Sequence, residues 1–436
     1  MVYRMKLTLW ARLLYLVPSM MWRTVLNKPL TSAALRRLQN KKLRALITHS
    51  YAHVPYYHNL FNKAGLHPDD IQTVDDLPKI PITRKTDLRD LPVEDVLASD
   101  VTVDQCHVTR TSGTTGIPLT IYWDRKARLL NYVTMARWQL ECGDAITHKA
   151  IDLGSGTGLP KIHPFKKLGI FRKKWVSPFI DVKTQLDEIK AYDPRSLFSY
   201  PTLLEEFCKE IIDRDIQGLH IQLVITGGEH LDDSTRALIT KVLDAEVFNQ
   251  YGARELGKIS NECGNHQGLH TCAELNFVEI TRDGEVLSMG KAGEVTVTNL
   301  NNHAMPFIRY IVEDIGVLLG SECQCGNCAP LMRLTEGRKK DRVWLPNERM
   351  VPALVLIEVL RQVPGLRQFQ IVQEDHDRFL VRIIRGRGMS KTAPDEIQEQ
   401  LLPILGDVMI EVHEVDSISR EKSGKLRQFI SHVPTT

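Results

Sequence analysis

Residues 109–120 form a segment whose groups could hold a phosphate. The segment reads TRTSGTTGIPLT, which places small hydroxyl side chains beside two glycines and contains no lysine. Backbone amides and hydroxyls in such a loop can close around an anion, whereas a Walker loop would end in Gly-Lys-Ser or Gly-Lys-Thr. We predict a phosphate-binding loop, with a plain surface loop as the alternative, formed by Thr111, Ser112, Gly113, Thr114, Thr115 and Gly116.

Two further segments follow short apolar runs and offer groups that suit a nucleotide. In TGGE, the glycines Gly227 and Gly228 would let a flat ligand approach the backbone closely. In NQYGARELG, the ring of Tyr251 could stack on a base, and the carboxylate of Glu255 could hold a magnesium ion that bridges phosphates. An ordinary turn and a solvated surface charge are the alternatives.

Three charged residues nearer the C-terminus complete this set of polar groups. Asp314, in IRYIVEDIG, could accept hydrogen bonds from both hydroxyls of a ribose. Arg338 lies in GRKKD, and Lys425 follows a Ser-Gly pair in ISREKSGKLR. Each of them could equally be a solvated charge, because that is the commonest place for such residues.

Five of the eight cysteines lie between residues 263 and 328. Clustering of this kind, in a chain without a clear secretory signal, favours reduced thiols and a metal over disulfides, and it favours the cytoplasm. Four thiolate or imidazole ligands suit tetrahedral zinc, and free buried cysteines are the alternative. The candidate ligands are Cys263, His266, His270, Cys272, Cys323, Cys325 and Cys328.

Composition and charge are those of an ordinary globular protein. The 436 residues are 43% hydrophobic and 25% charged, with a formal net charge of +3. That charge is too mild to indicate nucleic acid as a partner. The longest apolar stretch, residues 7–22, contains Arg12 and Pro18 and does not have the pattern of a membrane span. We expect a helix that packs on its own domain, and peripheral membrane contact remains the alternative.

The pattern of short elements indicates an α/β fold. Strands are expected at 197–201, 223–229 and 246–252, with helices between them at 202–214 and 232–243. Strand–helix–strand repeats of this kind form parallel sheets, and ligands bind where the strands end. A hairpin is expected around Asp283 and Gly284 because Asp-Gly favours the tight turn between antiparallel strands.

The domain organisation that we expect is a large N-terminal domain followed by a small α+β domain. The joint lies near Lys339, so the domains are residues 1–338 and 339–436. Within the first, residues 1–30 form an apolar helical segment and residues 31–64 form helices of 3.6-residue periodicity. Residues 260–335 form a β-rich part that zinc would hold together.

The order of these motifs resembles that of the adenylate-forming superfamily, in its phenylacetate–CoA ligase and CapK-like branch. The resemblance runs from about residue 35 to residue 430, and it rests also on HVPYYHNLFNKAG, DDLPKIPITRKTDL, NNHAMPFIRYIVEDIG and CQCGNCAP. It implies a multi-sheet α/β domain with a small, mobile C-terminal lid. It also implies a ligase that uses ATP to convert a small carboxylic acid into an acyl-adenylate, and then passes the acyl group to CoA or another acceptor.

The resemblance also implies a role for each motif. Lys425 would neutralise charge between the substrate carboxylate and the α-phosphate, and Glu255 would bind Mg²⁺. Residues 111–116 would cradle the phosphates. The remaining nucleotide-binding residues would be Gly227, Gly228, Glu229, Gln250, Tyr251, Gly252, Asp314 and Arg338. Structural zinc would be held by Cys263, His270, Cys323 and Cys325, with the participation of His266 or Cys328 left open.

Two departures from the branch bear on the metal site and on the acceptor. Arg254 stands where a small hydroxyl residue is usual, so it could pair with Glu255 or contact phosphate itself. VWLPNERMV, residues 343–351, replaces a glycine-bearing stretch that helps to line the CoA passage. A carrier protein or an amine is therefore an alternative acceptor. The alternative function is nucleotide-dependent action on an amine or sugar in polysaccharide or natural-product biosynthesis. The acid and the oligomeric state are not legible in the sequence.

Overall fold

The computed structural model describes residues 30–111, 118–154, 169, 172–320, 323–336, 342–346, 349–421 and 424–433. The chain divides into two compact units. The first unit draws on residues 1–146, 248–312 and 316–333, and the second unit on residues 147–247, 313–315 and 334–436. The second unit therefore combines the middle of the chain with its C-terminal region, and the domain boundary near Lys339 remains a prediction.

Two helices open the described part of the first unit, as the periodicity predicts. Helix α2 (Ser32–His53) begins where the Thr31 hydroxyl accepts a hydrogen bond from the Ala34 N–H, and α3 (Pro55–Lys63) begins with a proline. Their apolar faces are buried at Leu43, Ile47 and Phe61. The other helical elements are η1 (Pro68–Asp70), η2 (Val74–Lys79), α4 (Lys85–Arg89), α5 (Val93–Val96), η3 (Val103–Gln105) and α6 (Arg125–Glu141).

Most strands of the first unit are antiparallel. Strands β1 (His107–Arg110) and β2 (Thr120–Trp123) form a hairpin. The expected turn at Asp283 and Gly284 joins β10 to β11, with φ of 52° and 87°. The other strands are β7 (Glu246–Ala253), β8 (Gly257–Glu262), β9 (Leu269–Thr271), β10 (Asn276–Arg282), β11 (Glu285–Val286), β12 (Gly293–Asn299), β13 (Tyr310–Gly320) and β14 (Leu331–Glu336). Some of them include residues of the second unit.

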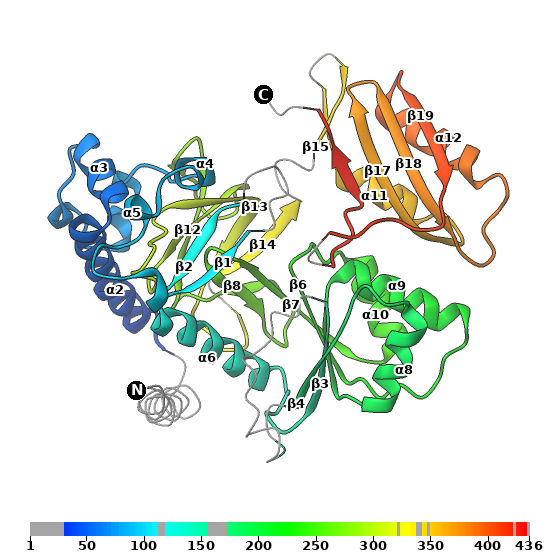
Figure 1. Cartoon of the computed structure of the whole chain (residues 1–436), viewed down its shortest axis with the longest axis horizontal. Helices are drawn as coiled ribbons and strands as arrows, with labels where there is room; N and C mark the ends of the chain where they lie inside the picture. The colour runs from blue at the N-terminus through cyan, green and yellow to red at the C-terminus, as the bar shows by residue number, and fades with distance from the viewer. Residues whose placement is uncertain are drawn as a thin grey trace. The chain divides into compact units, whose positions relative to one another are not determined.

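The second unit contains the parallel sheet that the sequence pattern predicts. Its strands β3 (Lys149–Leu153), β4 (Arg172–Val176), β5 (Ser196–Ser199) and β6 (Leu223–Gly227) run in the order β6-β5-β3-β4. Helices α8 (Val182–Tyr192), α9 (Pro201–Asp213) and α10 (Asp233–Leu243) lie beside this sheet (Figure 1). They bury a shared core that includes Leu186, Phe207 and Val224. The predicted α/β class is confirmed.

The C-terminal region forms the expected α+β arrangement. Strands β19, β18, β17 and β20 make a four-stranded sheet in that order, and Phe369, Phe379 and Leu401 lie in its core. The elements are β15 (Arg342–Trp344), β16 (Met350–Pro352), α11 (Ala353–Arg361), β17 (Leu366–Asp375), β18 (Arg378–Arg385), α12 (Ala393–Leu405), β19 (Met409–Glu414) and β20 (Phe429–Ser431).

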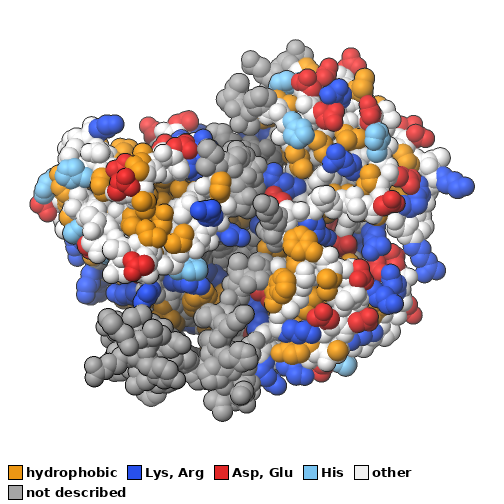
Figure 2. Space-filling model, viewed as in Figure 1, with side chains coloured by type: hydrophobic (Ala, Val, Ile, Leu, Met, Phe, Trp, Pro, Cys, Tyr) orange, Lys and Arg blue, Asp and Glu red, His pale blue; other side chains and the backbone are white. Residues whose placement is uncertain are grey.

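No helix among the described residues has the length and apolarity needed to cross a membrane. The apolar stretch at residues 7–22 lies outside the described residues, so the expected helix packed on its own domain stays a prediction, with membrane contact as its alternative. Basic and acidic side chains are interspersed over the face seen in Figure 2. This mixture fits the small net charge of +3.

A buried arginine fixes the start of β13 in the first unit. Arg309 is 2% exposed, and its guanidinium lies 3.3 Å from the Glu279 carboxylate. It also donates to the carbonyls of Ile80 and Gly284, at 2.7 and 2.9 Å. The arginine therefore ties three segments together immediately before Tyr310.

Replacing Arg309 should destabilise the first unit strongly. In Arg309→Met the Glu279 carboxylate stays buried without its cation, which costs about 3–5 kcal/mol. Urea unfolding measures the change. The control is Arg282→Met, whose exposed guanidinium contacts the Ala292 carbonyl and whose loss should change stability by less than about 0.5 kcal/mol. Equal effects of the two substitutions would contradict this account.

Candidate functional site

The predicted phosphate loop closes the β1–β2 hairpin. The Thr111 N–H donates to the Leu119 carbonyl, and the Thr111 hydroxyl oxygen accepts from the Leu119 N–H, both at 3.0 Å. Thr111 therefore continues the pairing of the hairpin beyond Arg110. Its hydroxyl oxygen is the acceptor in that bond, so the hydroxyl hydrogen is not used there. The other predicted loop residues, Ser112, Gly113, Thr114, Thr115 and Gly116, lie outside the described residues.

Arg254 places a cation at the base of this hairpin. Its guanidinium donates to the Arg110 carbonyl at 3.2 Å, and its own carbonyl accepts from the Trp123 indole at 3.2 Å. Arg110 directly precedes Thr111. Of the two expectations for Arg254, a position near the phosphate loop therefore has geometric support.

The segment around Tyr251 lies on β7 and the turn that follows it. Gln250 and Tyr251 pair with Asn261 and Ser260 of β8, and Tyr251 is 8% exposed. A Cβ at Gly252 would lie 2.5 Å from the Gly257 carbonyl, so only glycine fits there. Gly252 therefore has a packing reason as well as its predicted role.

The predicted magnesium ligand has one well-defined contact. A carboxylate oxygen of Glu255 accepts a hydrogen bond from the Tyr310 hydroxyl at 3.2 Å, and Glu255 is half-buried. Tyr310 follows the anchored Arg309, so the anchor fixes the carboxylate in turn. A carboxylate with one oxygen oriented in this way suits a hard cation such as Mg²⁺.

The structure brings Lys425 to the glycine pair that ends β6. The Lys425 ammonium donates to the Gly228 carbonyl and lies 5.2 Å from the centre of the Tyr200 ring. Gly228 has φ of 82°, and a Cβ there would lie 3.1 Å from the Lys425 Nζ and 3.2 Å from the Tyr200 ring. Two residues nearly 200 positions apart thus meet at the carboxyl end of a parallel strand, where ligands bind in such sheets.

Tyr200 is the residue around which this part of the second unit is built. It is 8% exposed. A Cβ at Gly154 would lie 3.0 Å from its ring, and one at Gly424 would lie 2.5 Å from Pro178 and 3.9 Å from the ring. Small residues at these positions let three loops approach one aromatic ring. The sequence analysis identified Gly228 but not Gly154 or Gly424.

Glu229 has a structural contact that the sequence analysis did not foresee. Its carboxylate accepts from the Thr202 N–H at 3.1 Å and from the Thr202 hydroxyl at 2.8 Å. These groups lie in the first turn of α9, where an anion is favoured. Burial raises the pKa of this carboxyl, and Lys425 and the Thr202 hydrogen bonds partly offset the rise. The side chain holds α9 in place, and a contact with adenine remains a prediction.

The turn that carries Lys425 is fixed by hydrogen bonds and ion pairs. The Gly424 N–H donates to the Glu421 carbonyl at 2.8 Å, and the Glu421 N–H donates to the Lys425 carbonyl at 2.9 Å. Arg420 donates to the Gly424 carbonyl at 3.2 Å and forms an ion pair with Glu206 of α9. Both partners of that pair are 12% exposed. The hydrogen bonds of this one turn therefore aim the amine at Gly228.

Further ion pairs join the C-terminal region to α9 and α10 inside the second unit. The Arg361 guanidinium pairs with Asp232, and the Arg367 guanidinium lies 2.7 Å from Glu210. Lys209 donates to the Leu366 carbonyl at 3.1 Å. These contacts support the position in which Lys425 reaches the end of β6.

The structure describes only one of the two residues predicted to bind the ribose. Asp314 is half-buried on β13 in the second unit, next to Glu313, whose φ is 71°. Arg338 lies outside the described residues. Both roles remain predictions.

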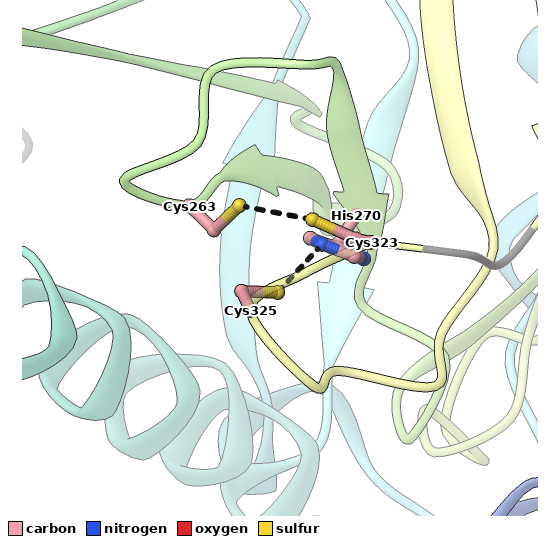
Figure 3. Close-up of side chains that lie close together, drawn as sticks. All are labelled: Cys263, His270, Cys323 and Cys325. Atoms are coloured by element: carbon pink, nitrogen blue, oxygen red, sulfur yellow. Dashed lines mark hydrogen bonds between the residues drawn. The ribbon is translucent and has the colours of Figure 1, made fainter.

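The four predicted zinc ligands lie together in the first unit (Figure 3). Cys263 follows β8, His270 lies on β9, and Cys323 and Cys325 lie between β13 and β14. The sulfur atoms of Cys263 and Cys323 are 3.6 Å apart, and the Cys325 sulfur lies 3.2 Å from His270 Nε2. Tetrahedral zinc with Zn–S near 2.3 Å and Zn–N near 2.0 Å needs ligand atoms roughly 3.5–3.8 Å apart. The sulfur–sulfur distance lies within this range and the sulfur–nitrogen distance is slightly shorter, so small side-chain shifts would let the four donors hold zinc.

Neighbouring groups orient these donors. His270 is 2% exposed and its Nδ1 lies 3.0 Å from the Ala329 carbonyl, so the Nε2 faces the sulfurs. Burial raises the pKa of Cys323, but the Cys325 N–H and nearby side chains outweigh it and lower the value to about 6. His266 contacts Glu262 at 3.2 Å, and Cys328 packs beside Leu35. Neither joins the group of four.

The relatives found among known proteins share a name or a kind of name, CoA ligase. Residues 343–432 match the CapK C-terminal domain. Phenylacetate-coenzyme A ligase from Thermus thermophilus is 28% identical over 78% of this chain and 78% of its own length. The enzyme of that name from Aromatoleum evansii is 27% identical over 92% and 95%. A crystal structure of 2-hydroxyisobutyryl-CoA ligase, in a postadenylation state with an acyl-AMP, superposes with a TM-score of 0.76. It is 17% identical and covers 94% of this chain and 91% of its own.

The chain is therefore similar over most of its length to phenylacetate-coenzyme A ligases, and its C-terminal region is similar to the CapK C-terminal domain. These findings support the predicted resemblance, and the agreement with a solved CoA ligase confirms the predicted fold. At 17% identity that agreement is one of architecture.

Substituting Gly228 should cost more than substituting another left-handed glycine. Gly218 has φ of 79° with no atom near its missing Cβ, whereas Gly228 has φ of 82° and faces Lys425 and Tyr200. Gly228→Ala should destabilise by about 1–3 kcal/mol more than Gly218→Ala, because it adds overpacking to backbone strain. Urea unfolding of both variants measures the difference. Equal losses would mean that the Lys425 contact does not constrain this glycine.

Proposed function

We propose that this chain is an ATP-dependent ligase that activates a carboxylic acid as an acyl-adenylate and transfers the acyl group to a thiol. The observation that carries the proposal is the ammonium of Lys425 at the Gly228 carbonyl, where β6 ends. The enzyme class, AMP-forming acid–thiol ligase, is that of the four curated relatives. The structure of the acid is left open.

The reaction has two balanced steps. In the first, a carboxylate oxygen attacks the α-phosphorus of ATP, an O–P bond forms, and pyrophosphate leaves. In the second, a thiol sulfur attacks the acyl carbon, the thiol proton is lost, and AMP leaves with the electron pair. Negative charge gathers between the two reacting anions in the first step, so a positioned cation lowers its barrier.

Lys425 is the cation that we assign to the first step. Its turn is fixed by Arg420, and its amine rests at a backbone carbonyl beside the Tyr200 ring. A lysine held in this way is oriented before substrate arrives, which is the condition for electrostatic stabilisation. The mobility of the C-terminal lid, which would let the site change between steps, belongs to the same proposal.

The other groups of the proposed mechanism come from both units, and those for the phosphates come from the first. Thr111 and the rest of residues 111–116 would bind phosphate, with the Arg254 cation near the base of the hairpin. Glu255 would hold Mg²⁺, which supplies charge neutralisation at the phosphates when bound. The nucleoside is assigned two sets of contacts. They are Gln250, Tyr251 and Gly252 in the first unit, and Gly227, Glu229 and Asp314 in the second. Arg338 is assigned to the ribose by resemblance alone.

We propose CoA as the thiol acceptor. The support comes from relatives and structural neighbours that are named as CoA ligases. A second candidate is an amine or sugar amino group, favoured by the match of residues 343–432 to the CapK C-terminal domain. In this chain Val343 of β15 pairs with Val351 of β16, and Val343 and Leu345 are buried in the C-terminal core.

We also propose structural zinc at Cys263, His270, Cys323 and Cys325. Three thiolates and one imidazole, from the residue that follows β8, from β9 and from the β13–β14 connection, would join these parts of the first unit. Asn265 and Asn327 contribute N–H groups 3.6 and 3.4 Å from the sulfurs of Cys323 and Cys325, which stabilises thiolates. Reduced thiols are consistent with the cytoplasmic location that we propose.

Lys425→Ala should lower ATP–pyrophosphate exchange by about 10²–10³-fold, because it removes a preorganised charge from the first transition state. The assay uses a panel of aliphatic and aromatic carboxylic acids, which also identifies the substrate class. The control is Lys391→Ala, an exposed lysine in the same region, which should exchange at the wild-type rate. Exchange that survives in Lys425→Ala would overturn the assigned role.

Product analysis decides between the two acceptors. With the activating acid, ATP and either CoA or a small primary amine, we expect an acyl thioester and release of AMP with CoA. Amide formation with no thioester would reject CoA and favour the second candidate. Mass spectrometry detects both products in one reaction.

Metal analysis tests the zinc proposal. Purified wild-type chain should contain about one equivalent of zinc, and Cys323→Ser should lose most of it, because the ligand set is incomplete. Chelation should lower the melting temperature of the wild type. Cys106→Ser is the control, since Cys106 lies outside the cluster. Zinc retained fully in Cys323→Ser would contradict the assignment.

A further inference from the structure

A second group of metal-binding side chains lies at the end of α2 in the first unit. His49, His53 and Asp100 each offer a donor atom, and these atoms lie within 4.8 Å of one another. We propose that the three residues bind a divalent cation of the zinc class. This site is separate from the cysteine cluster and has no part in the proposed catalytic steps.

The two histidines have the spacing of a helical chelate. Residues four apart share one face of a helix, and their ring centres here are 4.8 Å apart. His49 Nε2 lies 3.1 Å from an Asp100 carboxylate oxygen. Tetrahedral zinc with bonds of about 2.0–2.1 Å to nitrogen or oxygen places its ligand atoms roughly 3.3–3.4 Å apart. Imidazole and carboxylate donors match the preference of this ion.

The backbone holds these side chains together without a metal. The Ser99 N–H donates to the His53 carbonyl at 2.8 Å, and the Ala98 N–H donates to the Ala304 carbonyl at 2.8 Å. These bonds fix Asp100 against the last turn of α2. Side chains brought together by a fixed backbone lose less entropy when they bind a cation.

The surroundings of the three side chains are partly closed to solvent. His49 is 18% exposed, and its Nδ1 is buried with no hydrogen-bond partner among the described residues. The His303 ring lies 5.0 Å from the His49 ring, so a third imidazole borders the group.

Three protein ligands leave the fourth position of a tetrahedral ion to water, as in open zinc sites. The ion would connect the end of α2 with the segment that follows α5. Because Ala98 of that segment donates to the Ala304 carbonyl, the cation would stabilise the N-terminal part of the first unit. We therefore expect a bound metal to raise the melting temperature.

Equilibrium dialysis of the full chain against Zn²⁺ tests the proposal. The double variant His49→Gln/His53→Gln should bind one equivalent less than the wild type. His58→Gln should match the wild type, because His58 is exposed on α3 and contacts Tyr51 rather than the three proposed ligands. The same comparison in a Cys323→Ser background separates this site from the cysteine cluster. Equal zinc contents of the double variant and the wild type would overturn the proposal in either background.

A single substitution provides a second test in case the double variant does not fold. His53→Gln keeps an amide near Ser99, whose hydroxyl lies 3.3 Å from His53 Nδ1. Its zinc affinity at this site should fall by at least about tenfold, and the zinc-dependent rise in melting temperature should shrink. An unchanged affinity and an unchanged rise would reject His53 as a ligand and the site with it.

Discussion

The meeting of Lys425 with Gly228 is the interaction on which the proposed chemistry depends. An ammonium group reaches a backbone carbonyl only if no side chain blocks it, and a Cβ at position 228 would lie 3.1 Å from the nitrogen. The same glycine has a positive φ and directly follows β6. One small residue therefore satisfies the backbone, the Tyr200 ring and the proposed catalytic lysine together.

Charge organises the surroundings of that contact. Helix α9 carries Glu205, Glu206 and Glu210, and arginines of the C-terminal region pair with all three. Burial raises the pKa of Glu206, and Arg420 and Arg367 counteract the rise. Removing one member of such a set leaves another buried charge without a partner, so the pairs specify one arrangement of the second unit.

The first unit depends on fixed side chains in a similar way. Arg309 anchors the segment that carries Tyr310, and Tyr310 orients Glu255. The cysteine cluster connects β8 and β9 with the region between β13 and β14. The Arg309 contacts and the proposed zinc site would both restrain loops of the first unit. The distribution of these anchors explains why a β-rich unit can hold polar side chains in defined positions.

The sequence by itself determined the α/β class and the resemblance to adenylate-forming enzymes, because strand–helix alternation and motif order are features of the chain alone. The resemblance in turn implied the four residues of the cysteine cluster. The sequence did not reveal the approach of Gly154 and Gly424 to Tyr200, the contact of Glu229 with α9, or the histidine pair beside Asp100. Those features join residues far apart in the chain, and only tertiary packing decides which distant side chains meet. His266 and Cys328 show the same limit, since their spacing was compatible with zinc but their packing directs them elsewhere.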